Sequence, residues 1–183
     1  MNDQEIREEL CAFIDNRYGK VRIMDEIVIG NVRADIVTVT DCLTGYEIKS
    51  DADSYTRLPG QIKEYDRHFQ QNYLVVGQSH RKSAAAHIPP HWGILCASQS
   101  EGGIEIEELR EPAPNPKFSL KKQLTLLWKS ELMHILHTNR YPRYPHKTKA
   151  FKRRFLLENM DHETLQQKIC EELFERDWTV FGT

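Results

Sequence analysis

The chain has 183 residues, of which 39% are hydrophobic and 28% charged, and its formal net charge is −2. This composition supports a packed core and excludes disordered, collagen-like and disulfide-scaffold proteins, and the four cysteines include no CxxC pair that would indicate a zinc ribbon. Because no apolar run approaches the roughly 18 residues that span a bilayer and no signal peptide is recognisable, we expect a cytoplasmic protein that does not enter a membrane.

The beginning of the chain predicts a helix followed by three strands. Apolar side chains recur with a period of 3.6 residues over 3–17, and Gly19 ends that run. Strands are predicted at 21–29, 33–40 and 45–50. The connections between them are too short for crossover helices, so we expect an antiparallel meander.

A second helix and three more strands are predicted next. The helix covers 55–71, with an effective start near Pro59. The strand at 72–77 follows a helix, so we expect it to join the sheet in parallel with an earlier strand. The remaining elements of this half are a helix at 79–87, a buried strand at 92–97 and an edge strand at 104–109.

A proline-rich stretch predicts how the chain is divided. Residues 112–118 have the composition of a linker. They would separate a domain at 1–111 from a helical C-terminal extension at 119–183. The helices predicted within the extension are 120–136, 147–159 and 163–176.

A basic segment at 140–154 is the clearest charge feature of the extension. It contains no acidic residue, and the acidic stretch 158–177 follows it. The candidate contacts to a nucleic-acid backbone are Arg140, Arg143, Lys147, Lys152 and Arg153, with Tyr141, Tyr144 and Phe151 available to stack on bases. The alternatives are a solvated helix with a charged loop, or a patch paired with the acidic helix within the fold or across a homodimer.

Three charged residues in the predicted meander point to metal chemistry. Alternate side chains of a strand share a face, so Glu47 and Lys49 point the same way. If the second and third strands pair through the turn at 41–45, Asp35 comes close to Glu47. Two carboxylates and a lysine are expensive inside a sheet unless a divalent cation such as Mg²⁺ or Mn²⁺ uses them. The alternative is that Asp35 ends a turn and the other two residues lie on a solvated face.

The second predicted helix carries a further polar candidate. Gln61 lies on its apolar stripe and forms an i, i+4 pair with Tyr65 on the side that faces the sheet. A buried glutamine needs hydrogen-bond partners. The alternative is a glutamine at the border of the helix that makes only a local contact.

The motif residues are, in order, Asp35, Glu47-Ile48-Lys49, Gln61 and Tyr65. Their order and spacing resemble the PD-(D/E)XK nuclease superfamily, in particular its RecB-like branch with a QxxxY motif and its short bacterial and phage members. The resemblance covers residues 1 to about 97. It implies an α/β fold with a restriction-endonuclease-like core of order α-β-β-β-α-β, in which helices flank a mixed central sheet. The all-helical C-terminal extension would follow this core.

The resemblance also implies roles for individual residues. The metal ligands would be Asp35, Glu47, the carbonyl of Ile48 and one more acid. For this acid Glu5 of the first helix matches best, and Asp3 and Glu9 of the same helix and Glu26 of the first strand remain alternatives. The catalytic residues would be Asp35, Glu47, Lys49 as the catalytic lysine, and Gln61. Tyr65 would contact the nucleic-acid backbone or brace Gln61.

The function implied is a metal-dependent nuclease that hydrolyses phosphodiester bonds of nucleic acid, with DNA expected as substrate and Mg²⁺ or Mn²⁺ as cofactor. The first alternative is a non-catalytic module that binds nucleic acid or a protein on the same fold. A third interpretation is a regulator or immunity-type protein that contacts a partner through its C-terminal helices. Fold kinship alone does not decide among them.

Overall fold

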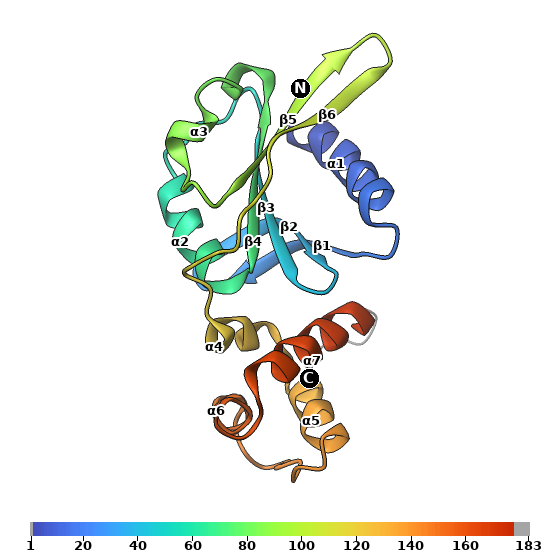
Figure 1. Cartoon of the computed structure of the whole chain (residues 1–183), viewed down its shortest axis with the longest axis vertical. Helices are drawn as coiled ribbons and strands as arrows, with labels where there is room; N and C mark the ends of the chain where they lie inside the picture. The colour runs from blue at the N-terminus through green and yellow to red at the C-terminus, as the bar shows by residue number, and fades with distance from the viewer. Residues whose placement is uncertain (1, 178–183) are drawn as a thin grey trace. The chain divides into compact units, whose positions relative to one another are not determined.

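The computed structural model describes residues 2–177 and consists of two compact units, Met1–Phe118 (unit 1) and Ser119–Thr183 (unit 2), coloured blue to yellow and yellow to red in Figure 1. The last six residues of the predicted extension, 178–183, lie outside the described residues. Within residues 2–177, no helix combines the length and the apolar character needed to cross a bilayer.

Unit 1 is built on one sheet whose strands follow chain order. The strands are β1 (Arg22–Ile29), β2 (Val32–Val39), β3 (Leu43–Lys49), β4 (Gln71–Gly77), β5 (Gly93–Ser100) and β6 (Gly103–Arg110). β4 pairs in parallel with both β3 and β5, and every other pairing is antiparallel. The predicted meander, the parallel fourth strand and the edge strand are therefore confirmed.

The helix α1 (Asp3–Tyr18) covers one face of this sheet. Ile6, Leu10 and Ile14 are buried in a core cluster that also includes Tyr46 and Tyr73 from the central strands. The stacking of these two tyrosine rings, with centroids 5.2 Å apart, fills the sheet surface under the helix. The chain leaves α1 at a glycine with a φ of 65°, as the sequence predicts.

The helix α2 (Leu58–His68) joins β3 to β4 and packs on the other face. Its Tyr65 and the following Phe69 lie directly over Gly45, where there is no room for a side chain. Pro59 occupies the first turn of the helix, where its missing N–H leaves no hydrogen bond unmade. The order α-β-β-β-α-β, with helices on both faces of a mixed sheet, is thus the one that the resemblance implies.

The helix predicted at 79–87 forms only in part. The structure has a 3₁₀ turn, η1 (Gln78–His80), and a single helical turn, α3 (Ala84–His87). The latter ends at Ile88, whose φ of −129° and ψ of 155° are extended. Such a conformation is expected before Pro89, because a residue that precedes proline avoids the helical region.

The proline-rich segment 112–118 lies within unit 1 and is attached to the end of α2. The side-chain amide of Asn115 donates to the carbonyls of Asp66 and Phe69, both at 2.7 Å. The backbone N–H of Asn115 donates to the Gln70 carbonyl at 3.1 Å. This stretch is consequently ordered against the helix.

Unit 2 contains α4 (Leu120–Gln123), η2 (Leu124–Leu126), α5 (Lys129–Thr138), α6 (Lys149–Asn159) and α7 (His162–Glu175). The prediction of one helix over 120–136 was wrong. Leu127 and Trp128 are extended, with ψ of 141° and 164°. The Glu131 carboxylate accepts from the Trp128 backbone N–H at 2.7 Å, which stabilises a new helix start at this point.

Candidate active site

The antiparallel pairing of β2 and β3 brings the two predicted carboxylates together. Ile36 pairs with Tyr46, so the next position of the same register sets Asp35 opposite Glu47. The Asp35 Oδ2 atom accepts a hydrogen bond from the backbone N–H of Ile48 at 2.8 Å. This bond holds the Asp35 carboxylate beside β3.

Glu47 is the most enclosed group of the centre, with 1% of its surface exposed. Its Oε1 accepts hydrogen bonds from the Lys49 ammonium and from the Gln61 amide. Among the described residues, the buried Glu47 Oε2 and Gln61 Oε1 atoms have no hydrogen-bond partner. The centre therefore combines a buried ion pair with two unsatisfied oxygens.

Tyr65 is fully buried behind these groups and does not reach the surface. Its hydroxyl donates to the Tyr46 carbonyl at 3.2 Å and accepts from the Asp35 N–H at 3.2 Å. The predicted contact of Tyr65 with nucleic acid is corrected on this point, because both hydrogen bonds of the hydroxyl are internal. Tyr65 instead holds β2 and β3 together beside the carboxylates.

The electrostatics of the centre favour protons on its carboxyl groups. Burial, reinforced by the charge of Glu47, raises the pKa of Asp35 to about 7, against the opposing effects of the Ile48 N–H, Lys49 and Arg7. Burial also raises the pKa of Glu47, although the Lys49 charge opposes it. A cation bound between the two carboxylates would relieve this repulsion.

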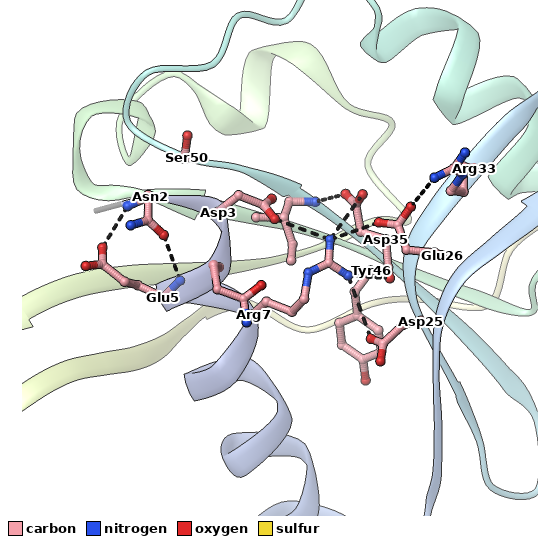
Figure 2. A network of polar contacts seen from close by, with 12 residues as sticks. Asn2, Asp3, Glu5, Arg7, Asp25, Glu26, Arg33, Asp35, Tyr46 and Ser50 are labelled. Carbon is pink, nitrogen blue, oxygen red and sulfur yellow. Dashed lines mark hydrogen bonds and ion pairs between the residues drawn. The ribbon is translucent and has the colours of Figure 1, made fainter.

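Arg7 is a site residue that the sequence analysis missed. Figure 2 shows its guanidinium, projecting from α1, among four carboxylates. Nη2 lies 3.3 Å from Asp3, 3.2 Å from Glu26 and 3.6 Å from the Asp35 carboxylate, whereas Nη1 lies 3.7 Å from Asp25 and donates to the Asp35 carbonyl at 2.7 Å. The available signal was the position of Arg7 four residues after Asp3, which sets both on one face of the helix.

The structure separates Glu5 from the centre. Its carboxylate accepts from the Asn2 backbone N–H at 2.8 Å, and its own N–H donates to the Asn2 side chain at 2.9 Å. This capping box uses Glu5 to start α1, so its predicted role as a metal ligand is corrected. Glu9 is exposed, while Asp3 and Glu26 contact Arg7.

The oxygen atoms of the centre are suited to a hard divalent cation. Within residues 2–177, no group of three or more His, Cys, Asp or Glu side chains is arranged to hold a metal ion. The donor set consists instead of two carboxylates, Asp35 and Glu47, and the amide oxygen of Gln61. Because the buried oxygens of Glu47 and Gln61 lack partners within the described chain, these residues fit Mg²⁺ or Mn²⁺, which favours such ligands completed by water.

The basic segment of unit 2 is folded rather than extended. Arg140, Arg143 and Lys147 are exposed, and Arg153 is half-buried. Lys152 is buried, and its ammonium donates to the Lys147 carbonyl at 2.6 Å, so its predicted contact with nucleic acid is corrected. This bond ties the first turn of α6 to the loop that precedes it.

The aromatic residues of the same segment also pack internally. The Tyr141 hydroxyl donates to the Asn159 carbonyl at 2.7 Å. The Tyr144 ring lies edge-on to Phe151 and Phe155, with centroids 5.1 Å from each. These contacts anchor the segment to α6 and leave the rings of Tyr141, Tyr144 and Phe151 half-buried.

A basic groove lies between α4 and α6. Its volume is about 720 Å³, and its charged lining consists of Lys121, Lys122, Arg153, Arg154 and Glu158. Lys121 and Lys122 were not predicted as contacts, although the adjacent pair of lysines was a visible signal. The groove therefore brings basic residues from two separate parts of unit 2 to one surface.

Three comparisons relate the chain to known proteins. The family model described as Bacteriophage P4 protein cII matches residues 1–178. Protein cII of Enterobacteria phage P4 is 23% identical over 141 residues, which cover 75% of this chain and 53% of that protein, so the chain spans about half the length of this curated relative. The solved structure of Pyrococcus furiosus SfsA in complex with Ca²⁺ aligns with a TM-score of 0.33 and 17% identity over 59% of each chain.

Proposed function

The chain belongs to the bacteriophage P4 protein cII family, and from the chemistry of its unit 1 we propose that this member is a metal-dependent nuclease. It would hydrolyse phosphodiester bonds of nucleic acid, with DNA as the expected substrate and Mg²⁺ or Mn²⁺ as cofactor. The proposal includes kinship with the RecB-like branch of the PD-(D/E)XK nucleases, which rests on Asp35, Glu47-Ile48-Lys49 and Gln61.

The proposal rests mainly on one observation, the unpaired buried oxygens of the site. Next to the Asp35 carboxylate, the Oε2 atom of Glu47 and the Oε1 atom of Gln61 are buried without a partner from the described residues. An unpaired buried oxygen destabilises a fold by roughly 1–3 kcal/mol. A divalent cation that accepts these oxygens as ligands removes that penalty.

The residues of the chain would divide the chemistry as follows. Asp35 and Glu47, with Gln61 and the Ile48 carbonyl, would hold the cation, which when bound activates water and stabilises charge on phosphate. Lys49, 5% exposed and paired with Glu47, would orient the attacking water or stabilise the developing negative charge on the phosphate. Tyr65 would keep Asp35 in place through its backbone.

The basic groove of unit 2 supports a polyanionic substrate. Lys121, Lys122 and Arg154 line one surface, and such residues bind phosphate groups irrespective of sequence. The exposed side chains of Arg140, Arg143 and Lys147 add positive charge to the same unit. We therefore assign backbone binding to unit 2 and hydrolysis to unit 1.

A cleavage assay tests the catalytic proposal. Linear duplex, circular duplex, single-stranded, branched DNA and RNA are incubated with the full chain in Mg²⁺, Mn²⁺ or EDTA. We expect metal-dependent cleavage that Glu47→Gln and Lys49→Met each reduce at least 100-fold, because they remove a ligand and the charge beside it. Glu108→Gln is the control: this carboxylate of the same sheet pairs with Arg17 at 2.8 Å and is not part of the centre. Equal activity of all four proteins would refute the proposal.

The second candidate function is binding of nucleic acid without cleavage, which the basic groove favours on its own. In that case, the panel would be bound but not cut, and the Glu47→Gln variant would bind as the wild type does. Cleavage that disappears in Glu47→Gln, together with retained binding, would exclude this candidate.

A further inference from the structure

Arg7 lies within a cluster of four carboxylates of unit 1. Four carboxylates, those of Asp3, Asp25, Glu26 and Asp35, lie within 4 Å of its guanidinium. Only 15% of the Arg7 side chain is exposed, so its charge is partly shielded from solvent. A single guanidinium thus serves all four acids.

The geometry around Glu26 shows that the arrangement is held against local strain. Glu26 has a φ of 55°, a conformation that side-chain-bearing residues rarely adopt and that costs roughly 1–3 kcal/mol. Its carboxylate is bound by Arg7 at 3.2 Å and by Arg33 at 2.8 Å. The ion pairs with these two arginines offset the cost of the conformation and keep the Glu26 carboxylate beside Asp35.

The interaction of Arg7 with Asp35 differs from that of a surface ion pair. Nη1 binds the carbonyl of Asp35, and Nη2 approaches its carboxylate, so Arg7 fixes both the backbone and the side chain of that residue. From the opposite side, Tyr65 and the Ile48 N–H fix the same residue. Asp35 is thereby directed toward Glu47.

We propose that Arg7 is a positioning residue that takes the place of a second divalent ion, so that the centre binds one ion rather than two. This inference rests on the proposed function, because it assumes a first ion between Asp35 and Glu47. In two-ion phosphodiesterase centres, a carboxylate is shared between neighbouring cations. In this protein, the Arg7 guanidinium lies against Asp35 and forms ion pairs with the surrounding carboxylates.

Counting bound Mn²⁺ tests this inference without measuring cleavage. The full chain is freed of metal and titrated with Mn²⁺, and the free ion is followed by electron paramagnetic resonance. We expect one ion per wild-type chain, absent in Glu47→Gln, and two ions in Arg7→Met, which removes the guanidinium from all four acids and, within the described chain, leaves only Glu26 paired with another arginine, Arg33. Adding Asp25→Asn to Arg7→Met should return the count to one.

Two arginine variants are controls for charge and for folding. Arg7→Lys keeps the positive charge and should bind one ion. Arg17→Met removes an arginine of the same helix that pairs with Glu108, and should also bind one ion. If Arg7→Met does not unfold cooperatively, the wild type and Arg7→Lys decide: one ion in both supports the inference, and two in either overturns it.

The outcomes separate the inference from the proposed function. A Glu47-dependent ion in the wild type, with an unchanged count in Arg7→Met, overturns only the role of Arg7. A wild type without any Glu47-dependent ion overturns the proposed metal centre itself.

Discussion

At the scale of single residues, the centre is a set of charges that oppose one another unless a cation is present. Burial raises the pKa of both Asp35 and Glu47, and the charge of Glu47 raises that of Asp35 further. The charge of Lys49 opposes both pKa shifts, and the charge of Arg7 opposes that of Asp35. Without a divalent ion, the folded protein therefore retains protons that the unfolded chain releases.

This retention predicts a pH dependence of stability. Folded Asp35 keeps its proton up to a pKa of about 7, whereas the unfolded carboxyl titrates near 3.8. Between these two pKa values the folded state binds more protons than the unfolded chain. The stabilising effect of protonated Asp35 is therefore complete below about pH 4 and is lost as pH rises through 7. In urea unfolding with EDTA, we expect wild type to lose roughly 3 kcal/mol more than Asp35→Asn between these limits.

Asp51→Asn provides a control of opposite sign. The Ser79 backbone N–H lowers the pKa of Asp51 by donating to its carboxylate at 2.9 Å. The contribution of ionised Asp51 to the stability of the fold is therefore present above the ordinary carboxyl pKa and is lost as pH falls. Stability curves of wild type and Asp35→Asn that run parallel from pH 4 to 7 would contradict the assignment.

At the scale of elements, β3 carries the site because both of its faces are covered. Every residue from Leu43 to Lys49 is buried. Its Tyr46 faces the α1 core, whereas Gly45 lies under Tyr65 and Phe69 of the α2 side. The absence of a side chain at Gly45 lets α2 approach closely enough for Gln61 to reach Glu47.

Gly45→Ala should disturb this packing. A β-carbon at position 45 would lie 2.8 Å from the Tyr65 ring and closer still to the Phe69 ring, well inside van der Waals contact. We expect the unfolding free energy to fall by roughly 2 kcal/mol in urea denaturation. Gly60→Ala on α2, where a β-carbon would meet no described atom within 4 Å apart from its chain neighbours and the backbone of its own helix, should instead stabilise by roughly 0.5 kcal/mol. If the two substitutions changed the unfolding free energy equally, the close approach of α2 to Gly45 would not be needed for stability.

At the scale of the whole molecule, charge is divided between the two units. Unit 1 contains 19 acidic and 13 basic residues, whereas unit 2 contains 8 acidic and 12 basic residues. The near-neutral total therefore conceals an acidic unit that bears the candidate metal centre and a basic unit that bears the groove. Binding of a polyanion should depend on unit 2.

Salt titration of DNA binding tests this division. We expect the affinity of the full chain to fall linearly with salt on logarithmic axes. The Lys122→Ala and Arg154→Ala variants should each reduce the slope by about 1, because each leaves one phosphate group without its cationic side chain. Lys168→Ala is the control, because this lysine pairs with Glu171 on α7, outside the groove lining. Slopes that match the wild type in both groove variants would exclude the groove as the DNA-binding surface.

The place of Gln61 beside the site was what the family resemblance implied. The sequence by itself determined the order of the strands of unit 1, the antiparallel meander and the approach of Asp35 to Glu47 and Lys49. These features follow from hydrophobic period, short connections and the alternation of a strand, all of which act over a few neighbouring residues. The break at Leu127 was missed because a helical period persists across it, and the Glu131 cap depends on atomic geometry.

Only the tertiary structure decided which other side chains join or leave the centre. Arg7 reaches Asp35 because α1 is packed on the sheet, and the burial of Tyr65 follows from α2 lying over Gly45. Lys152 is enclosed for a similar reason, since its helix folds against the rest of unit 2. Residue type and spacing indicate which groups can take part in chemistry, but packing between distant segments determines which of them face a ligand and which are buried in the core.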